Sequence, residues 1–305
     1  MFSSRKSTTA EPVTPFSKVR HTIREMLRET RLAMGVIQLY RNWPIAFLER
    51  LHLLQPRPVV YRLRNGIELC AHTQTRDLFI MNENFLNQVY TCSPGFAIRD
   101  GWIIADVGGH KGIFAVFAAT RARDVVVYTF EPSRENFSFL SHNIQRNRLS
   151  NVRAFNVAVS GKDGELTLHL HREPAQNTFL QRPDAVPIGD ARVESWSLEH
   201  VLKTIASPLS LLKMDIEGME YEALLSCPTE ALQRVERIAL EYHDGWVHTP
   251  NHVSDLVDFL SSRGFSTRLI PDRKILVAER QTAGLLVTVA QLRSRSLGYS
   301  SNASS

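Results

Sequence analysis

Apolar and polar positions along residues 102–280 form short blocks that predict strands and helices in alternation. The apolar runs have the length of buried strands, and each is followed by a segment whose apolar residues recur at helical spacing. The expected strands are 102–106, 124–130, 152–159, 165–171, 209–215 and 236–242, and the expected helices are 110–122, 133–146, 197–204, 218–226 and 250–263. Such alternation indicates a mostly parallel sheet with helices on both faces.

The last two expected strands, 265–270 and 274–278, are separated by only three residues. Because a parallel crossover needs a longer connection, these two strands must form an antiparallel hairpin. The pattern therefore predicts a doubly wound α/β sheet closed by an antiparallel C-terminal hairpin. This arrangement is typical of class I methyltransferases rather than nicotinamide dehydrogenases. The polar segment 172–195 is expected to be a surface loop.

The pattern before residue 96 is different and predicts an appendage. Helical spacing covers 17–40 and a shorter helix covers 45–54. Asn65-Gly66 between two β-rich runs predicts a hairpin, and 76–90 is expected to be helical. We expect a disordered tail over 1–16, an appendage over 17–95, a main domain over 96–280 and a flexible tail over 281–305.

Composition fits a cytoplasmic globular protein. No apolar run approaches the roughly 20 residues of a membrane-spanning helix, and the N-terminus lacks the apolar core of a signal peptide. The three cysteines, Cys70, Cys92 and Cys227, have neither metal-site spacing nor a disulfide framework.

Charge is distributed unevenly along the chain. Residues 1–64 carry twelve Lys and Arg against four Asp and Glu, whereas the remainder carries twenty-four against twenty-seven. The slightly acidic main domain argues against nucleic-acid binding. The basic N-terminal helices have two interpretations. We favour the one in which they pack on the domain and cover its active site; the alternative is a weak contact with a membrane surface or an acidic glycan.

A glycine-rich turn between an apolar strand and a helix predicts the cofactor site. Asp106 ends the strand, and Gly108, Gly109 and Gly112 follow at a spacing that differs from the dinucleotide fingerprint. A carboxylate beside the turn would repel a pyrophosphate and suits a ligand with a positive amine, such as S-adenosyl-L-methionine. Glu131 ends the next strand, where a carboxylate accepts hydrogen bonds from ribose hydroxyls.

A second cluster of acidic residues follows the strand 209–215. Asp215 and Glu217 lie at the sheet edge where ligands bind in open α/β folds, and Glu241 and His243 follow the next strand. Glu217, His243 and Glu241 are candidates for a catalytic base, and the sequence leaves open which one acts. An oxygen-rich Mg²⁺ site is the alternative, but we expect these carboxylates to orient substrate hydroxyls without a metal.

These segments resemble the FkbM family of S-adenosylmethionine-dependent methyltransferases over roughly residues 100–280. The most specific match is 213–220, Lys-Met-Asp-Ile-Glu-Gly-Met-Glu, and 106–108, 130–132 and 156–159 also fit. One departure is His110, which stands where the family commonly has Asn.

The resemblance implies O-methylation of a hydroxyl on a sugar, a glycan or a natural product. It places Asp106 and Gly108 at the methionine part of the cofactor, and Glu131 at the ribose. It places Asn156 and Val157 at the adenine, and Asp215 near the sulfonium.

Two other classes of function stay open at this point. A nicotinamide-dependent oxidoreductase also uses an acidic residue at the position of Glu131, although the glycine spacing and the closing hairpin argue against it. A non-catalytic binding protein on a methyltransferase scaffold is the second alternative, since a fold does not guarantee activity. The sequence identifies neither the small-molecule or glycan acceptor nor the oligomeric state.

Overall fold

The computed structural model describes residues 30, 33–180, 186–244 and 252–281. Its centre is a seven-stranded sheet in the order β11-β12-β10-β9-β3-β4-β5. The strands are β3 (Ile103–Val107), β4 (Val126–Phe130), β5 (Val152–Phe155), β9 (Leu211–Met214), β10 (Arg237–Glu241), β11 (Phe265–Ile270) and β12 (Ile275–Arg280). Strands β5, β4, β3, β9 and β10 run parallel to one another, and β12 pairs antiparallel with both β10 and β11. The predicted fold class and closing hairpin are confirmed.

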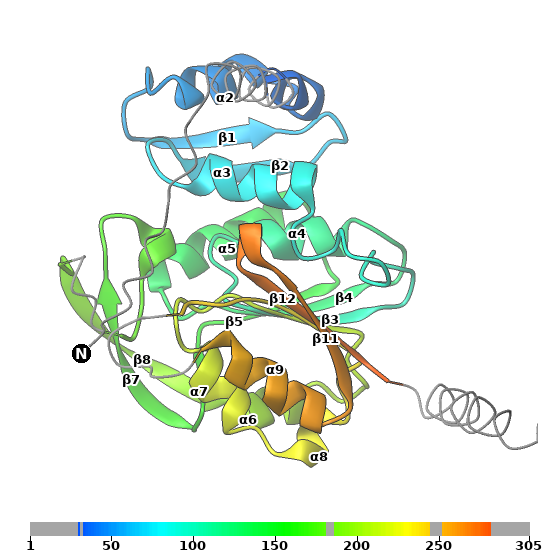
Figure 1. The fold of residues 1–305 in the computed structure, drawn as a ribbon. Coiled ribbons are helices and arrows are strands. Elements are labelled where there is room, and N and C mark those ends of the chain that lie inside the picture. The colour runs from blue at the N-terminus through cyan, green and yellow to red at the C-terminus, as the bar shows by residue number, and fades with distance from the viewer. Residues whose placement is uncertain (1–29, 31–32, 181–185, 245–251, 282–305) are drawn as a thin grey trace, which may run out of the picture.

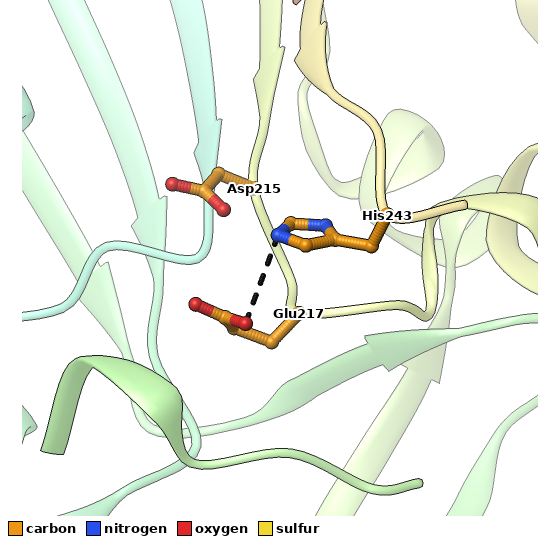
Figure 2. Close-up of side chains that lie close together, drawn as sticks. All are labelled: Asp215, Glu217 and His243. Carbon is orange, nitrogen blue, oxygen red and sulfur yellow. Dashed lines mark ion pairs between the residues drawn. The ribbon is translucent and has the colours of Figure 1, made fainter. Parts of the chain in front are cut away.

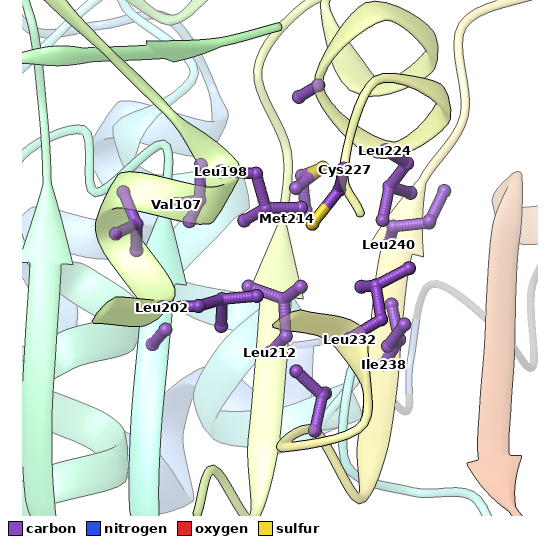
Figure 3. Close-up of a cluster of buried hydrophobic side chains, with 14 of the residues drawn as sticks. Val107, Leu198, Leu202, Leu212, Met214, Leu224, Cys227, Leu232, Ile238 and Leu240 are labelled. Carbon is purple, nitrogen blue, oxygen red and sulfur yellow. The ribbon is translucent and has the colours of Figure 1, made fainter. Parts of the chain in front are cut away.

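Helices cover both faces of this sheet (Figure 1). One face carries α4 (Ile113–Ala119) and α5 (Arg134–Arg146), and the other carries α6 (Leu198–Thr204), α7 (Glu220–Leu225), α8 (Thr229–Leu232) and α9 (Val253–Ser262). Figure 3 shows part of the core beneath the second face, where apolar side chains of β9 and β10 meet those of α6, α7 and α8. Burial on both faces explains why these strands are almost continuously apolar.

A smaller three-stranded sheet lies beside the main one, in the order β6-β8-β7. Its strands are β6 (Ala158–Ser160), β7 (Gly164–Leu170) and β8 (Gly189–Ser197), and a short 3₁₀ helix, η2 (Pro174–Gln176), precedes β8. Two expectations were wrong here. The single strand expected over 152–159 is two strands in different sheets, and the expected loop 172–195 contains most of β8. Strand β8 exposes its polar residues Asp190, Arg192 and Glu194 on one face, so it lacks the continuous apolar run of a strand buried on both faces.

The N-terminal appendage packs on α4. It consists of α2 (Trp43–Arg50), the antiparallel pair β1 (Pro58–Arg62) and β2 (Glu68–His72), α3 (Asp77–Asn82) and a π-helical turn, η1 (Glu83–Asn87). Leu78 and Met81 of α3 share one apolar cluster with Ile113 and Val116 of α4. The predicted hairpin is confirmed, whereas the helix expected over 76–90 changes to π geometry at Glu83 and ends before Gln88.

The expected tail 1–16, all but the first residue of the expected tail 281–305 and most of the helix expected over 17–40 lie outside the described residues. Residues 33–39 are helical as predicted. Among the helices that the structure describes, none combines the length and the apolar character needed to cross a membrane.

Candidate active site

A cavity opens at the carboxyl ends of β3, β4, β9 and β10, with a volume of about 1000 Å³ including its mouth. The glycine turn and Glu131 form one side of it, and Asp215, Glu217 and Glu241 form another. The sheet therefore brings both predicted clusters into one site, as expected for ligand binding at this edge of an α/β sheet.

The glycine turn packs tightly against the turn that follows strand β9. Gly108 has a left-handed φ of 84°, and a Cβ atom there would overlap the carbonyl oxygen of Asp215. A Cβ atom on Gly109 would overlap Thr129 Oγ1. Both positions line the cavity and require glycine, so the backbone itself forms this part of the wall. Gly112 is the N-cap of α4 and contacts Leu140.

Asp106 lies behind the glycine turn. Its carboxylate is fully buried, accepts a hydrogen bond from Thr129 Oγ1 at 2.9 Å and pairs with Lys213 Nζ at 3.1 Å. Lys213 Nζ also donates to the carbonyl oxygen of Gly108 at 2.8 Å. Asp106 is not among the residues that line the cavity, so in this structure it holds the turn through Lys213.

Glu131 lines the cavity at the end of β4. Its Oε2 accepts a hydrogen bond from the backbone N–H of His110 at 2.8 Å, and its Oε1 accepts one from that of Ser133 at 2.9 Å. Burial raises the pKa of Glu131 to about 7, although these two N–H groups favour the ionised form. The carboxylate is thus held in place beside the glycine turn.

The predicted adenine contacts, Asn156 and Val157, are close to Glu131 but do not line the cavity. Asn156 Nδ2 donates to the carbonyl oxygens of Glu131 and Pro132, and Val157 is buried in the core. Asn156 therefore supports the loop that carries Glu131.

The side chains of Asp215, Glu217 and His243 lie close together (Figure 2). Asp215 and Glu217 line the cavity, and His243 is not among the lining residues. His243 Nε2 lies 3.7 Å from Glu217 Oε2 and 3.9 Å from Glu241 Oε1. Ligand atoms of Asp215, Glu217 and His243 lie within 4.8 Å of one another, a spacing that can hold a metal ion.

Glu220 holds this turn from behind and is fully buried. It accepts hydrogen bonds from the backbone N–H groups of Ile216 at 2.8 Å and Gly218 at 3.0 Å, and its Oε1 lies 3.1 Å from His243 Nδ1. Glu220 is the first residue of α7 and fixes the turn that presents Glu217, whose φ is 50°.

Tyr90 is a site residue that the sequence did not reveal. Its hydroxyl donates to Asp215 Oδ2 at 3.0 Å and lies 3.4 Å from Glu241 Oε2, and its ring packs 5.3 Å from Lys213 Nζ. It follows η1 in the appendage, where no motif marks it. The appendage thus supplies part of the active site.

The pKa values of Glu217, Glu241 and His243 are all raised, but to different extents. Burial, reinforced by Asp215, raises the pKa of Glu241 to about 8, and burial raises that of Glu217 to about 7. Burial alone would lower the pKa of His243, but the neighbouring carboxylates, Glu220 first, raise it to about 10. At neutral pH His243 is therefore an imidazolium, while Glu241 is poised to exchange a proton.

His110 and Lys111 attach the glycine turn to the appendage. Lys111 Nζ pairs with Asp77 Oδ2 at 2.6 Å, and neither side chain is exposed to solvent. His110 lines the cavity, and its Nε2 lies 3.7 Å from Asp77 Oδ1. Burial lowers the pKa of His110 to about 4, so its ring is neutral. The pair of Asp77 and Lys111, 34 positions apart in the chain, thus joins the appendage to the glycine turn.

Residues 106–267 match the model of the methyltransferase FkbM domain, which covers more than half of the chain. The chain belongs to the FkbM methyltransferase family. This membership confirms the resemblance stated from the sequence, and it supports a methyltransferase over a nicotinamide-dependent oxidoreductase. The match supports S-adenosyl-L-methionine as the cofactor, as the sequence predicted.

Two relatives match most of their own length. The chain is 25% identical over 259 residues to 31-O-demethyl-FK506 methyltransferase FkbM of Streptomyces tacrolimicus, covering 73% of this chain and 97% of that protein. It is 24% identical over 229 residues to Methyltransferase 1 of Beauveria bassiana, covering 66% and 89%. A Streptococcus mutans protein solved with S-adenosylhomocysteine is similar over 67% of this chain and 97% of that one, at 14% identity and a TM-score of 0.40.

Proposed function

We propose that this methyltransferase is S-adenosyl-L-methionine-dependent and transfers the methyl group to a hydroxyl of a sugar, a glycan or another natural product. The observation that carries the proposal is the wall of carboxylates opposite the glycine turn, in the same cavity. Carboxylates accept hydrogen bonds from hydroxyl groups and can take up the proton that a hydroxyl loses. The relative from Streptomyces tacrolimicus is named for methylation at an oxygen.

The cofactor residues fit this proposal. S-Adenosyl-L-methionine supplies a methyl group already activated by a sulfonium, so alignment of donor and acceptor provides most of the rate. Glu131 would accept hydrogen bonds from the ribose hydroxyls, and the backbone at Gly108 and Gly109 leaves room for close approach. Asp215, at the carboxyl end of β9, would lie near the positive sulfonium.

We assign the base to Glu241. Its carboxylate lines the cavity between the Tyr90 hydroxyl and the His243 ring, and burial raises its pKa to about 8, so that it can exchange a proton near neutral pH. The hydroxyl of Tyr90 lies between the carboxylates of Glu241 and Asp215 and contacts both. Glu217 and the His243 imidazolium would orient the acceptor hydroxyl, because His243 has no free proton-accepting nitrogen while it is protonated.

The proposal needs no metal ion. An imidazolium offers no lone pair to a cation, so a metal would have to displace the proton that the surrounding carboxylates hold on His243. Activity that a chelator abolishes and Mg²⁺ restores would replace this interpretation with a metal site at Asp215, Glu217 and His243.

The proposal is tested by methyl transfer from labelled S-adenosyl-L-methionine to a panel of acceptors. The panel should contain hydroxylated sugars and macrolides together with amines, thiols and RNA of matched size. Product analysis by mass spectrometry should locate the methyl group on oxygen. Transfer only to nitrogen, sulfur or RNA would contradict the proposed acceptor class, and cofactor binding without any transfer would favour the non-catalytic scaffold.

A further inference from the structure

Exposed apolar side chains concentrate in one short stretch of the appendage. Among the described residues, eleven large apolar side chains are exposed, and seven of them belong to residues 34–53. These seven are Met34, Ile37, Trp43, Phe47, Leu48, Leu51 and Leu53, with exposed fractions between 36% and 64%. Single exposed apolar residues are ordinary, whereas such a concentration marks an interaction surface.

Helix α2 shows that this exposure has a direction. Trp43 and Phe47, one turn apart, are both exposed and their rings are in edge contact at 6.3 Å. The inward side of the same helix carries Ala46 and the carboxylate of Glu49, which accepts a hydrogen bond from the backbone of Gln74. A surface helix ordinarily buries its large apolar side chains, whereas α2 exposes Trp43 and Phe47 to solvent.

The location of α2 leaves this side facing outward. Figure 1 shows α2 at one end of the molecule, separated from the main sheet by β1, β2 and α3. Within the described part of the appendage, α3, η1 and Tyr90 contribute residues to the cavity wall, whereas α2 contributes none. The outer side of α2 therefore does not serve to cover the cavity, which was the interpretation favoured from sequence.

The exposed charges within residues 33–64 have one sign. Between residues 33 and 64 the chain has five arginines and one acidic residue, and that residue is the buried Glu49. All five arginines, Arg41, Arg50, Arg57, Arg62 and Arg64, are exposed. Arg62 is paired with Glu68, whereas Arg41 lies between Ile37 and Trp43 in the chain and Arg57 follows Leu53. The exposed apolar residues thus have exposed arginines beside them.

We propose that residues 34–57 form a docking surface for an anionic phospholipid bilayer, which we call the basic apolar surface. Tryptophan, phenylalanine and leucine side chains enter the boundary between headgroups and acyl chains, and arginines at the border contact lipid phosphates. The charge complementarity selects an anionic bilayer rather than an uncharged apolar partner. Docking would hold the catalytic domain beside a membrane, independently of the acceptor that it methylates.

The test is co-sedimentation of the full chain with vesicles. Vesicles of phosphatidylglycerol and phosphatidylcholine should retain the protein, and vesicles of phosphatidylcholine alone should retain far less. The triple variant W43S/F47S/L51S should lower the partition coefficient by about tenfold or more. The matched control is V186S/I188S, which removes two apolar side chains that are exposed elsewhere and should bind as the wild type does.

A second pair of variants tests the arginines separately. R41E/R57E should lower binding and reduce its dependence on salt, whereas R192E/R268E, which changes two exposed arginines on strands of the catalytic domain, should lower it much less. Equal retention on both vesicle types, or a triple variant that binds as the wild type does, would overturn the proposal. A wild-type dimer that the triple variant dissociates, without vesicle binding, would assign the surface to self-association instead.

Discussion

The two sides of the active-site cavity differ in how their charges are balanced. On the side proposed for the cofactor, Asp106 is paired with Lys213, and Glu131 is held by two backbone N–H groups. On the side proposed for the acceptor, Glu217 and Glu241 lie within 4 Å of His243, and Asp215 is close to both Glu217 and His243. Carboxylates held by a buried lysine or by backbone N–H groups build a fixed binding surface, whereas crowded carboxylates beside an imidazole are suited to proton transfer.

The largest expected effect is the loss of the base. Glu241→Gln should lower kcat by about 10²–10⁴-fold, the usual contribution of a general base, without changing affinity for S-adenosylhomocysteine. The measurement is steady-state kinetics with an accepted substrate. Glu217→Gln, which removes the neighbouring carboxylate, is the matched comparison and should also reduce turnover.

The pH profile distinguishes these two variants. A carboxylate base acts when deprotonated, so kcat should rise as the pH passes about 8 and Glu241 loses its proton. It should fall again as His243 loses its proton near pH 10. Glu241→Gln should remove the rise, and Glu217→Gln should retain it; the reverse result would assign the base to Glu217.

The next effect concerns stability, at the junction of the appendage and the cofactor turn. Asp77→Ala leaves Lys111 as a buried, unpaired charge, so the free energy of unfolding should fall by about 3–5 kcal/mol. Urea denaturation measures this. Asp100→Ala removes an exposed pair with Arg123 and should cost about 1 kcal/mol or less. Equal losses in both variants would mean that the appendage is not held through Lys111.

A smaller effect is expected on the cofactor side. Glu131→Ala should weaken binding of S-adenosylhomocysteine by about 1.5–3 kcal/mol, the usual loss for hydrogen bonds to a charged group. Calorimetric titration measures it. Glu135→Ala, which changes an exposed carboxylate in the next helix, serves as the control. Unchanged affinity in Glu131→Ala would show that the ribose assignment is wrong.

The smallest effect distinguishes the hydroxyl of Tyr90 from its ring. Tyr90→Phe keeps the ring contact with Lys213 but removes a hydrogen bond of about 0.5–1.5 kcal/mol to the carboxylates. Because that bond favours the ionised carboxylates, its loss should move the rise in the pH profile upward by about half to one pH unit. Tyr128→Phe, outside the cavity, should leave the profile unchanged.

The sequence predicted the parts of the site that depend on local order along the chain. Asp215 and Glu131 follow apolar strands, and parallel strands bring their carboxyl ends to one edge, so their proximity follows from the strand pattern. The role of Asp106 could not be derived in this way. Its carboxylate faces inward to Lys213, and only the three-dimensional arrangement shows this.

Tyr90 and Asp77 could not be predicted because their contacts are distant along the chain. Tyr90 reaches Asp215 across 125 positions, after a π-helical turn and a left-handed Gln88 that redirect the backbone. No periodic pattern encodes such a change of direction. Strand β8 was missed for another reason: its residues alternate between its two faces, but few of the inner ones are large and apolar, so the segment reads as polar.

The most direct test of the contrast between the two sides is calorimetric titration of the wild type, Glu131→Ala and Glu241→Gln with S-adenosylhomocysteine. The wild type and Glu241→Gln should bind with the same micromolar-range affinity, and Glu131→Ala should bind at least about tenfold more weakly. Equal binding by all three, or a loss confined to Glu241→Gln, would contradict the division into a cofactor side and an acceptor side.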